Sequence, residues 1–169
     1  MLLGACRPRL LASTLVTREL YLEDLEAGQT YRSGSLTLTP ESIKAFARDF
    51  DPQPFHTDEA AAAGSFFGGL AASGWHTAAL TMRLLVTGEF RIAGGLIGAG
   101  VEDLCWPRPV RPGDTLSIES EVLAVRSLRS RPTHGLVKLR TVTRNAAGET
   151  VQEFTASLVV PRREAPAGS

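Results

Sequence analysis

Cysteine is scarce in this chain. The 169-residue sequence contains two cysteines, Cys6 and Cys105, which lie too far apart to form a zinc-binding or redox motif of the CxxC kind. Cys105 follows an apolar run and precedes Trp106, so we predict a buried thiol that packs as a small apolar side chain. So little cysteine is typical of a protein of the reducing cytoplasm.

An excess of charge of either sign is also lacking, as is any long hydrophobic run. The chain has 18 Lys and Arg against 18 Asp and Glu, which gives no basis for attracting a nucleic acid. No apolar run approaches the ~18 residues of a membrane-spanning helix. Fingerprints of phosphate and dinucleotide loops are absent too, so we expect the glycines at positions 94, 95, 98 and 100 to be turn residues.

The composition is that of one globular domain. A chain of 169 residues with 43% hydrophobic content is long enough for a single well-formed core. Residues 1–18 weakly imitate a targeting peptide, but their apolar stretches are short and broken, so we expect a disordered extension. We place the domain at residues 19–161 and a flexible tail at residues 162–169.

Three helices are predicted in the first half of the chain. Residues 40–50 follow the start signal Thr39-Pro40 and carry a stripe of four apolar residues, Ile43, Phe46, Ala47 and Phe50, that we expect to pack on the core. Residues 58–63 read as a short helix capped by Thr57. Residues 75–86 are apolar on most sides, which predicts a helix buried all round.

The remaining segments have the period-two pattern of strands. Residues 30–38 read as an edge-like strand, and apolar residues alternate with polar ones after position 115 and again around residues 154–160. Residues 145–148 supply a turn between two such strands. This order predicts an α+β fold in which an antiparallel sheet wraps around a long central helix.

The segment DPQPFH, residues 51–56, carries the strongest chemical signal. It places one carboxylate, Asp51, and one imidazole, His56, five residues apart on a backbone that two prolines restrict. Because imidazole titrates near neutral pH and a nearby carboxylate can be tuned to share its protons, we predict an acid/base pair. Either residue alone would more often be a cap or a solvated side chain.

A glycine-rich stretch, FGGLAASG at residues 67–74, leads into the predicted central helix. Gly74 stands where that helix begins, so its N–H group and the positive end of the helix dipole are free to meet a ligand. Because glycine has no side chain, a ligand can also approach the backbone closely at this position. We therefore predict at Gly74 a backbone N–H donor that a ligand can approach.

These motifs, with a third, WPRPVRPGDTL at residues 106–116, resemble the MaoC-like dehydratases and (R)-specific enoyl-CoA hydratases, a family of hot-dog fold. The resemblance covers residues 21–160. Gln53 stands where the family's usual residue is asparagine, and Ser73 where many members have histidine. A hydroxyl residue that some members carry in the central helix is not clearly matched, although Thr77 and Thr81 lie nearby.

The resemblance implies a function and a site. It implies that Asp51 and His56 add water across an enoyl-CoA thioester, while Gly74, with Gln53 and Ser73, binds the substrate and the enolate. The His56 N–H is a candidate second donor. The implied partners are an acyl-CoA and a second copy of the chain in a homodimer. No metal is implied, and the only cofactor-like molecule is the coenzyme A of the substrate.

Other interpretations remain open on the sequence alone. A hot-dog thioesterase would drive water onto the carbonyl carbon, and a non-catalytic acyl-CoA binding subunit would bind without turnover. Arg126, Arg129 and Arg131 could meet coenzyme A phosphates, but we favour a solvated hairpin tip. His76 is interpreted as a structural histidine, and Trp75 as core or pocket wall.

Overall fold

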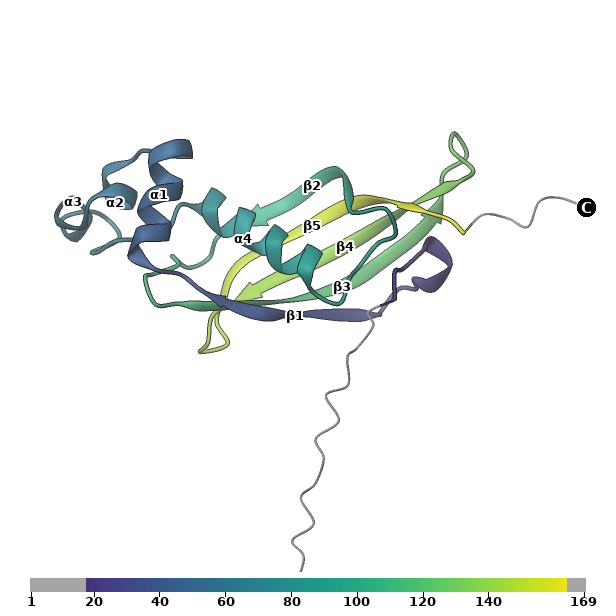
Figure 1. Cartoon of the computed structure of the whole chain (residues 1–169), viewed down its shortest axis with the longest axis horizontal. Helices are drawn as coiled ribbons and strands as arrows, with labels where there is room; N and C mark the ends of the chain where they lie inside the picture. The colour runs from purple at the N-terminus through teal and green to yellow at the C-terminus, as the bar shows by residue number, and fades with distance from the viewer. Residues whose placement is uncertain (1–17, 164–169) are drawn as a thin grey trace, which may run out of the picture.

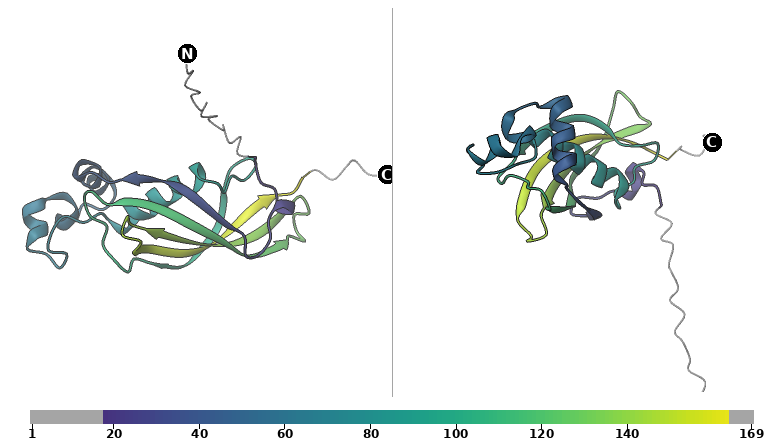
Figure 2. Two further views of the ribbon diagram at one scale, coloured as in Figure 1. Left: turned by 90° about the horizontal axis from the view of Figure 1, so that it is seen from below. Right: turned by 60° about the vertical axis from the view of Figure 1, so that its left-hand side comes forward.

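A curved antiparallel sheet with one long helix across its concave face dominates the computed structural model, which describes residues 18–163 (Figures 1 and 2). The sheet has five strands in the order β1-β3-β4-β5-β2. Their bounds are β1 (Thr30–Thr37), β2 (Ile97–Cys105), β3 (Thr115–Ser127), β4 (His134–Arg144) and β5 (Thr150–Pro161). This is the α+β arrangement that the sequence predicts.

The central strands show the alternation expected of a sheet with one covered face. Along β4 and β5 buried residues alternate with partly exposed ones, and Leu139 pairs with Ala156 in the antiparallel register. The predicted turn at residues 145–148 joins these two strands, and the side-chain oxygen of Asn145 accepts hydrogen bonds from the N–H groups of Ala147 and Glu149. Gly148 has a φ of 78°, a conformation that favours glycine.

Helix α1 (Pro40–Phe50) begins where the sequence predicts, and Thr39 caps it by accepting a hydrogen bond from the N–H of Ser42. Ile43 and Ala47 of its apolar stripe are fully buried. Phe50, however, is 71% exposed, so its predicted place in the core is wrong. The reason is that α1 lies beyond the end of the sheet, where no described residue covers the Phe50 side chain (Figure 1).

Between α1 and the central helix the chain forms two short helices. The sequence predicts one helix at residues 58–63 with Thr57 as its cap, whereas the structure has α2 (Pro54–Thr57) and α3 (Glu59–Ala63). Asp58 is the cap of α3, since its carboxylate accepts from the Ala61 N–H at 2.7 Å. Pro54 at the first position of α2 fits a helical start, so the segment containing His56 is a helical turn.

Helix α4 (Gly74–Thr87) is the long helix on the concave face. Its side toward the sheet is buried, with Thr77, Thr81, Leu84 and Leu85 among the covered residues. Its other side leaves Trp75, Met82 and Val86 exposed. The predicted all-round burial is therefore wrong for the single chain, because a sheet covers only one side of a helix.

The edge strand β2 departs most from the sequence prediction. Gly98 and Gly100, predicted as turn residues, lie within it. Nearly every side chain of β2 is exposed, including that of Cys105, so the predicted burial of this thiol is wrong. Cys6 lies outside the described residues. The cause is position, because β2 is an edge strand and the central helix packs against β1 and β3 at the other side of the sheet.

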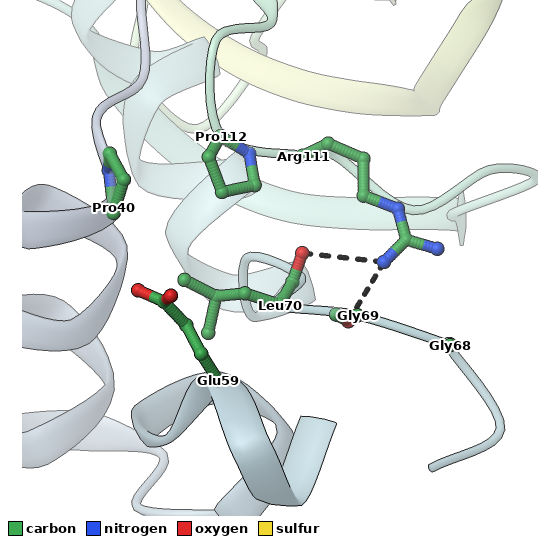
Figure 3. Close-up of a pocket in the computed structure, with 7 residues that line it drawn as sticks. All are labelled: Pro40, Glu59, Gly68, Gly69, Leu70, Arg111 and Pro112. Atoms are coloured by element: carbon green, nitrogen blue, oxygen red, sulfur yellow. Dashed lines mark hydrogen bonds between the residues drawn. The ribbon is translucent and has the colours of Figure 1, made fainter. Parts of the chain in front are cut away.

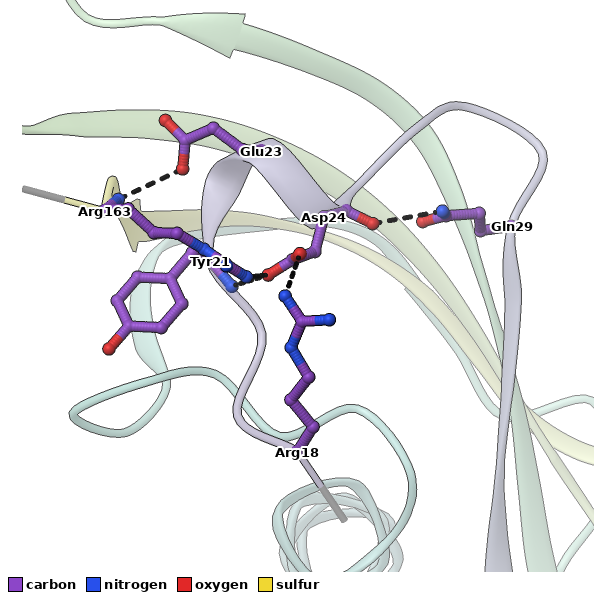
Figure 4. Close-up of polar contacts among 6 residues, drawn as sticks. All are labelled: Arg18, Tyr21, Glu23, Asp24, Gln29 and Arg163. Atoms are coloured by element: carbon purple, nitrogen blue, oxygen red, sulfur yellow. Dashed lines mark hydrogen bonds and ion pairs between the residues drawn. The ribbon is translucent and has the colours of Figure 1, made fainter. Parts of the chain in front are cut away.

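The two ends of the described chain meet beside the short helix η1 (Leu22–Asp24). The backbone N–H of Arg163 donates to the Glu23 carboxylate at 3.1 Å, and its guanidinium pairs with Asp24 (Figure 4). Arg18 also pairs with Asp24, at 3.0 Å. Arg162 also pairs with Glu23 at 3.1 Å. The flexible tail predicted from Arg162 onward thus does not include its first two residues, and residues 1–17 and 164–169 lie outside the described part. Within residues 18–163, no helix has the length and apolar character needed to cross a membrane.

His76 is a buried histidine on α4. Its ring stacks on Phe46, with centroids 4.5 Å apart and planes 6° from parallel. Its Nδ1 has no hydrogen-bond partner among the described residues. Burial lowers the pKa of His76 below its usual value, because the charged ring would lose its hydration.

This burial predicts a pH dependence of stability. Since the pKa of His76 is lower in the folded state, the unfolded chain takes up a proton first, and the free energy of unfolding falls as pH decreases below ~6.5. In urea unfolding measured from about pH 8 to about pH 5, His76→Phe is expected to flatten that decline. The matched variant His134→Phe, at the start of β4, should leave it unchanged. An equally steep decline in His76→Phe would contradict the prediction.

Candidate functional site

Asp51 lies at the junction between α1 and α2. It is the C-terminal cap of α1, and its N–H donates to the Ala47 carbonyl at 2.9 Å. Its side chain is 19% exposed. The helix-start signal at Thr39 therefore fixes where this acid stands, at the far end of an eleven-residue helix.

His56 lies on α2 and is buried, with 5% of its surface exposed. Its Nε2 is 3.5 Å from Oδ2 of Asp51, so the structure brings the two predicted catalytic side chains together. That distance is longer than a good hydrogen bond, which is common in unliganded catalytic sites. A small molecule with two hydrogens to donate, such as water, matches the two facing acceptors.

The other ring nitrogen of His56 fixes its tautomer. Nδ1 lies 2.7 Å from the carbonyl oxygen of Ala71. A carbonyl oxygen can only accept a hydrogen bond, so Nδ1 carries the hydrogen. In the neutral ring the lone pair is then on Nε2 and faces Asp51, where it can take a proton.

Asp51 is held by two hydrogen-bond donors. The Ser73 hydroxyl donates to Oδ2 at 2.6 Å, and the Gln53 side-chain amide donates to Oδ1 at 2.8 Å. Partial burial raises the pKa of Asp51, but the bonds from Ser73 and Gln53 and the nearby His56 outweigh it, so the pKa lies below its usual value. Gln53 and Ser73 thus contact the carboxylate itself.

The glycine-rich stretch ends where α4 begins. Ser73 is the cap, Gly74 is the first residue of the helix, and the Ser73 hydroxyl accepts from the Trp75 N–H at 3.2 Å. The N–H of Gly74 has no acceptor among residues 18–163. The His56 N–H is different, since it donates to the Gln53 carbonyl at 2.9 Å, so the second donor expected from the sequence is already engaged.

A cavity of about 290 Å³ opens beside these groups. His56, Gly74 and Thr77 lie in its wall together with the aromatic rings of Phe67 and Trp106. Asp51 is not part of this wall and borders it through His56. An apolar cavity with a base and a free N–H at one end is suited to a partly apolar substrate with a reactive carbonyl.

Arg111 holds the glycine-rich stretch in place, a role that the sequence analysis missed. Its guanidinium donates to the carbonyls of Gly69, at 2.8 Å, and Leu70 (Figure 3). It also donates to the Phe67 carbonyl. The backbone N–H of Arg111 donates to the Asp114 carboxylate at 2.7 Å. The only sequence signal for this role was that Arg111 lies in the motif at residues 106–116. Backbone carbonyls are present in every residue, so a segment that accepts through them carries no side-chain pattern.

The arginine cluster and His134 lie away from this site, whereas Trp75 adjoins it beside Gly74. Arg126 is at the end of β3, and Arg129 and Arg131 are in the hairpin loop that follows. His134 begins β4 and bonds the Thr133 hydroxyl at 2.9 Å. Thr81 is buried among β-strand residues, and Trp75 is exposed at 60%. Within the described residues no group of three His, Cys, Asp or Glu side chains is placed to hold a metal ion.

Two solved structures resemble this fold closely. A MaoC-like dehydratase from Rhodospirillum rubrum shares 54% identity with a TM-score of 0.83, covering 86% of this chain and 99% of that one. The R-hydratase PhaJ1 from Pseudomonas aeruginosa shares 28% identity with a TM-score of 0.70, covering 89% of this chain and 96% of that one.

Two curated proteins are similar in sequence. The uncharacterized protein YdeM of Bacillus subtilis is 33% identical over 102 residues, which are 60% of this chain and 72% of YdeM. The mesaconyl-CoA hydratase of Haloarcula marismortui is 28% identical over 118 residues, which are 69% of this chain but 28% of that protein.

The family comparison covers most of the domain. Residues 24–145 match the family described as the MaoC like domain, a span that contains Asp51, His56 and Gly74. The sheet wrapped around α4 is the hot-dog fold that the resemblance implied. The chain therefore belongs to the MaoC-like dehydratase family.

Proposed function

We propose that this protein is a hydro-lyase that interconverts an enoyl-CoA and a 3-hydroxyacyl-CoA. The observation that carries the proposal is the pair of facing acceptors, Nε2 of His56 and Oδ2 of Asp51, 3.5 Å apart at the start of α4. The similarity to an R-hydratase and to a mesaconyl-CoA hydratase supports it, and we extend it to (R)-specific hydration.

Water is the reactant that this pair is suited to hold. One hydrogen of the water would point to His56 Nε2 and the other to Asp51. As the water oxygen attacks C3 of the enoyl group, one of the two bases removes a proton, and that proton is then delivered to C2. The product gains OH and H, and the site returns to its starting protonation state.

The negative charge that develops on the thioester oxygen needs a donor. We assign this role to the N–H of Gly74, and its position at the N-terminus of α4, where the helix dipole is positive, supports the assignment. Losing such a donor typically costs ~3 kcal/mol in the reaction barrier. Gln53 and Ser73 serve the reaction through their bonds to Asp51.

No further cofactor enters this proposal, since the coenzyme A is part of the substrate and the two bases with the Gly74 N–H supply each chemical step. We place the reaction in the cytoplasm, where an exposed free thiol such as Cys105 stays reduced.

A second copy of the chain is the partner we propose for the exposed side of α4. Trp75, Met82 and Val86 form an apolar stripe there, and the edge strand β2 adds exposed Ile97 and Val101 with one side free of strand partners. Trp75 contacts Trp106, which follows β2, so the two surfaces are continuous. Apolar patches joined to a free strand edge are typical of an interface.

Hydration is tested by the loss of enoyl-thioester absorbance when the protein is added to crotonyl-CoA, with free thiol measured in parallel. Asp51→Asn and His56→Ala are each expected to lower kcat about 100-fold or more, because each removes a proton acceptor. The matched variants Asp49→Asn and His134→Ala, which alter an exposed acid and a distant histidine, should retain activity. Thiol release would identify a thioesterase, and binding without turnover would identify an acyl-CoA binding subunit.

The hydrogen bonds to Asp51 predict a shift in the pH profile. Ser73→Ala and Gln53→Leu each remove a donor that lowers the pKa of Asp51. The pKa should therefore rise, and the acid limb of kcat/KM should move to higher pH in both variants. Ser42→Ala, which removes a hydroxyl at the other end of α1, is the control. An unchanged acid limb in both variants would argue against an ionised Asp51 in the reaction.

If two copies of the chain pair through the exposed side of α4, a charge introduced there should separate them. Val86→Glu is expected to convert a dimer to a monomer and to lower activity, measured by light scattering coupled to size-exclusion chromatography. Leu123→Glu places the same charge at an exposed apolar position of β3 and should leave the mass unchanged. A wild-type monomer, or a dimer that Val86→Glu does not alter, would contradict this interface.

A further inference from the structure

Trp106 lies directly against the start of α4. A Cβ atom built on Gly74 would be 2.8 Å from Cε2 and 2.9 Å from Cδ2 of the indole, so the ring packs flat against the backbone of Gly74. The same ring forms part of the wall of the 290 Å³ cavity that His56 also lines. An acyl group that enters this cavity to reach the Gly74 N–H therefore lies beside the indole.

The indole is fixed in orientation although it is 39% exposed. Its Nε1–H donates to the side-chain oxygen of Gln152 at 2.8 Å. Gln152 lies on β5 and is fully buried. Because Gln152 is buried and cannot move freely, its hydrogen bond to the indole N–H restricts the orientation of the ring.

The bond to Trp106 sets the direction of a buried hydrogen-bond chain. An indole N–H can only donate, so the oxygen of the Gln152 amide faces Trp106 and its NH₂ group faces away. That NH₂ donates to the Thr81 hydroxyl at 3.0 Å. The Thr81 hydroxyl lies 2.7 Å from the Thr143 hydroxyl. Its hydrogen is then free to be donated to the Thr143 oxygen.

This chain joins three elements of the fold. Thr143 is on β4, Gln152 on β5 and Thr81 on α4, and all three residues are buried. A buried polar network with its partners in place holds one arrangement, because breaking any one bond leaves a desolvated group unpaired.

We propose that Trp106 is a specificity-determining wall of the acyl site and that Gln152, with Thr81 and Thr143, positions it. The proposal rests on the function proposed above. The flat indole beside Gly74 admits an unbranched enoyl thioester lying along it and excludes a methyl branch near the thioester carbonyl. A phenyl ring in place of the indole would be smaller and would lose the bond to Gln152.

The first test measures contact and does not require turnover. In a Trp75→Phe background Trp106 is the only tryptophan, since the chain has two. Titration with butyryl-CoA, which is saturated and cannot be hydrated, is expected to change the fluorescence of Trp106. Binding of butyryl-CoA by calorimetry with no fluorescence change would overturn the proposal, whether or not the protein is a hydratase.

The second test measures specificity. It compares kcat/KM for tiglyl-CoA, which has a methyl branch at C2, with kcat/KM for crotonyl-CoA. The ratio of the first to the second is expected to rise about 10-fold in Trp106→Phe, within the range for one methyl group in a pocket. Gln152→Met removes the acceptor with little change in volume and should raise the ratio in the same direction. The double variant should gain little more, because both substitutions release the same ring.

Ser120→Ala is the control for a loss of stability alone. It breaks another buried hydroxyl pair, Ser120 with Thr141 at 2.9 Å, and should leave the ratio unchanged. A ratio that stays at the wild-type value in both Trp106→Phe and Gln152→Met would overturn the proposal. If Gln152→Met does not fold, Trp106→Phe alone decides it. Hydration of crotonyl-CoA with an unchanged ratio would leave the proposed function intact and reject this inference.

Discussion

The Ser73 hydroxyl makes the contact on which the arrangement of the site depends. It donates to Asp51 at the end of α1 and accepts from the Trp75 N–H in the first turn of α4. One oxygen atom therefore links the element that carries the acid to the element that carries the Gly74 N–H. Because Ser73 is fully buried, water does not compete for these bonds, and the distance between the two halves of the site is fixed.

The tautomer of His56 depends on a second constraint, the path of residues 67–72. Arg111 binds the carbonyls of residues 67, 69 and 70, and the N–H of Ala72 donates to the Val110 carbonyl at 2.8 Å. The Ala71 carbonyl between them is left for His56. A guanidinium bound to backbone carbonyls thus determines which nitrogen of a histidine on another element carries the proton.

The parts of the site that the sequence predicted are those set by local signals. The cap Thr39, the first-turn proline and the helical period place Asp51, and the prolines place His56 near it. Arg111, Trp106 and Gln152 were given no role, because the partners that reveal their roles lie 41–71 residues away in the chain. The exposure of Phe50 and of one side of α4 was mispredicted for a related reason. An apolar stripe indicates that a face is covered, but it does not say whether the covering surface belongs to the same chain.

The contact between Gly74 and Trp106 also constrains how this protein can change. A methyl group at position 74 would overlap an indole that is itself bonded to a buried glutamine, so the ring cannot simply turn aside. Replacing Gly74 therefore requires a smaller residue at position 106, and replacing Trp106 opens space at position 74. The two positions should be inherited and engineered as a pair, because the room that each residue has is set by the other.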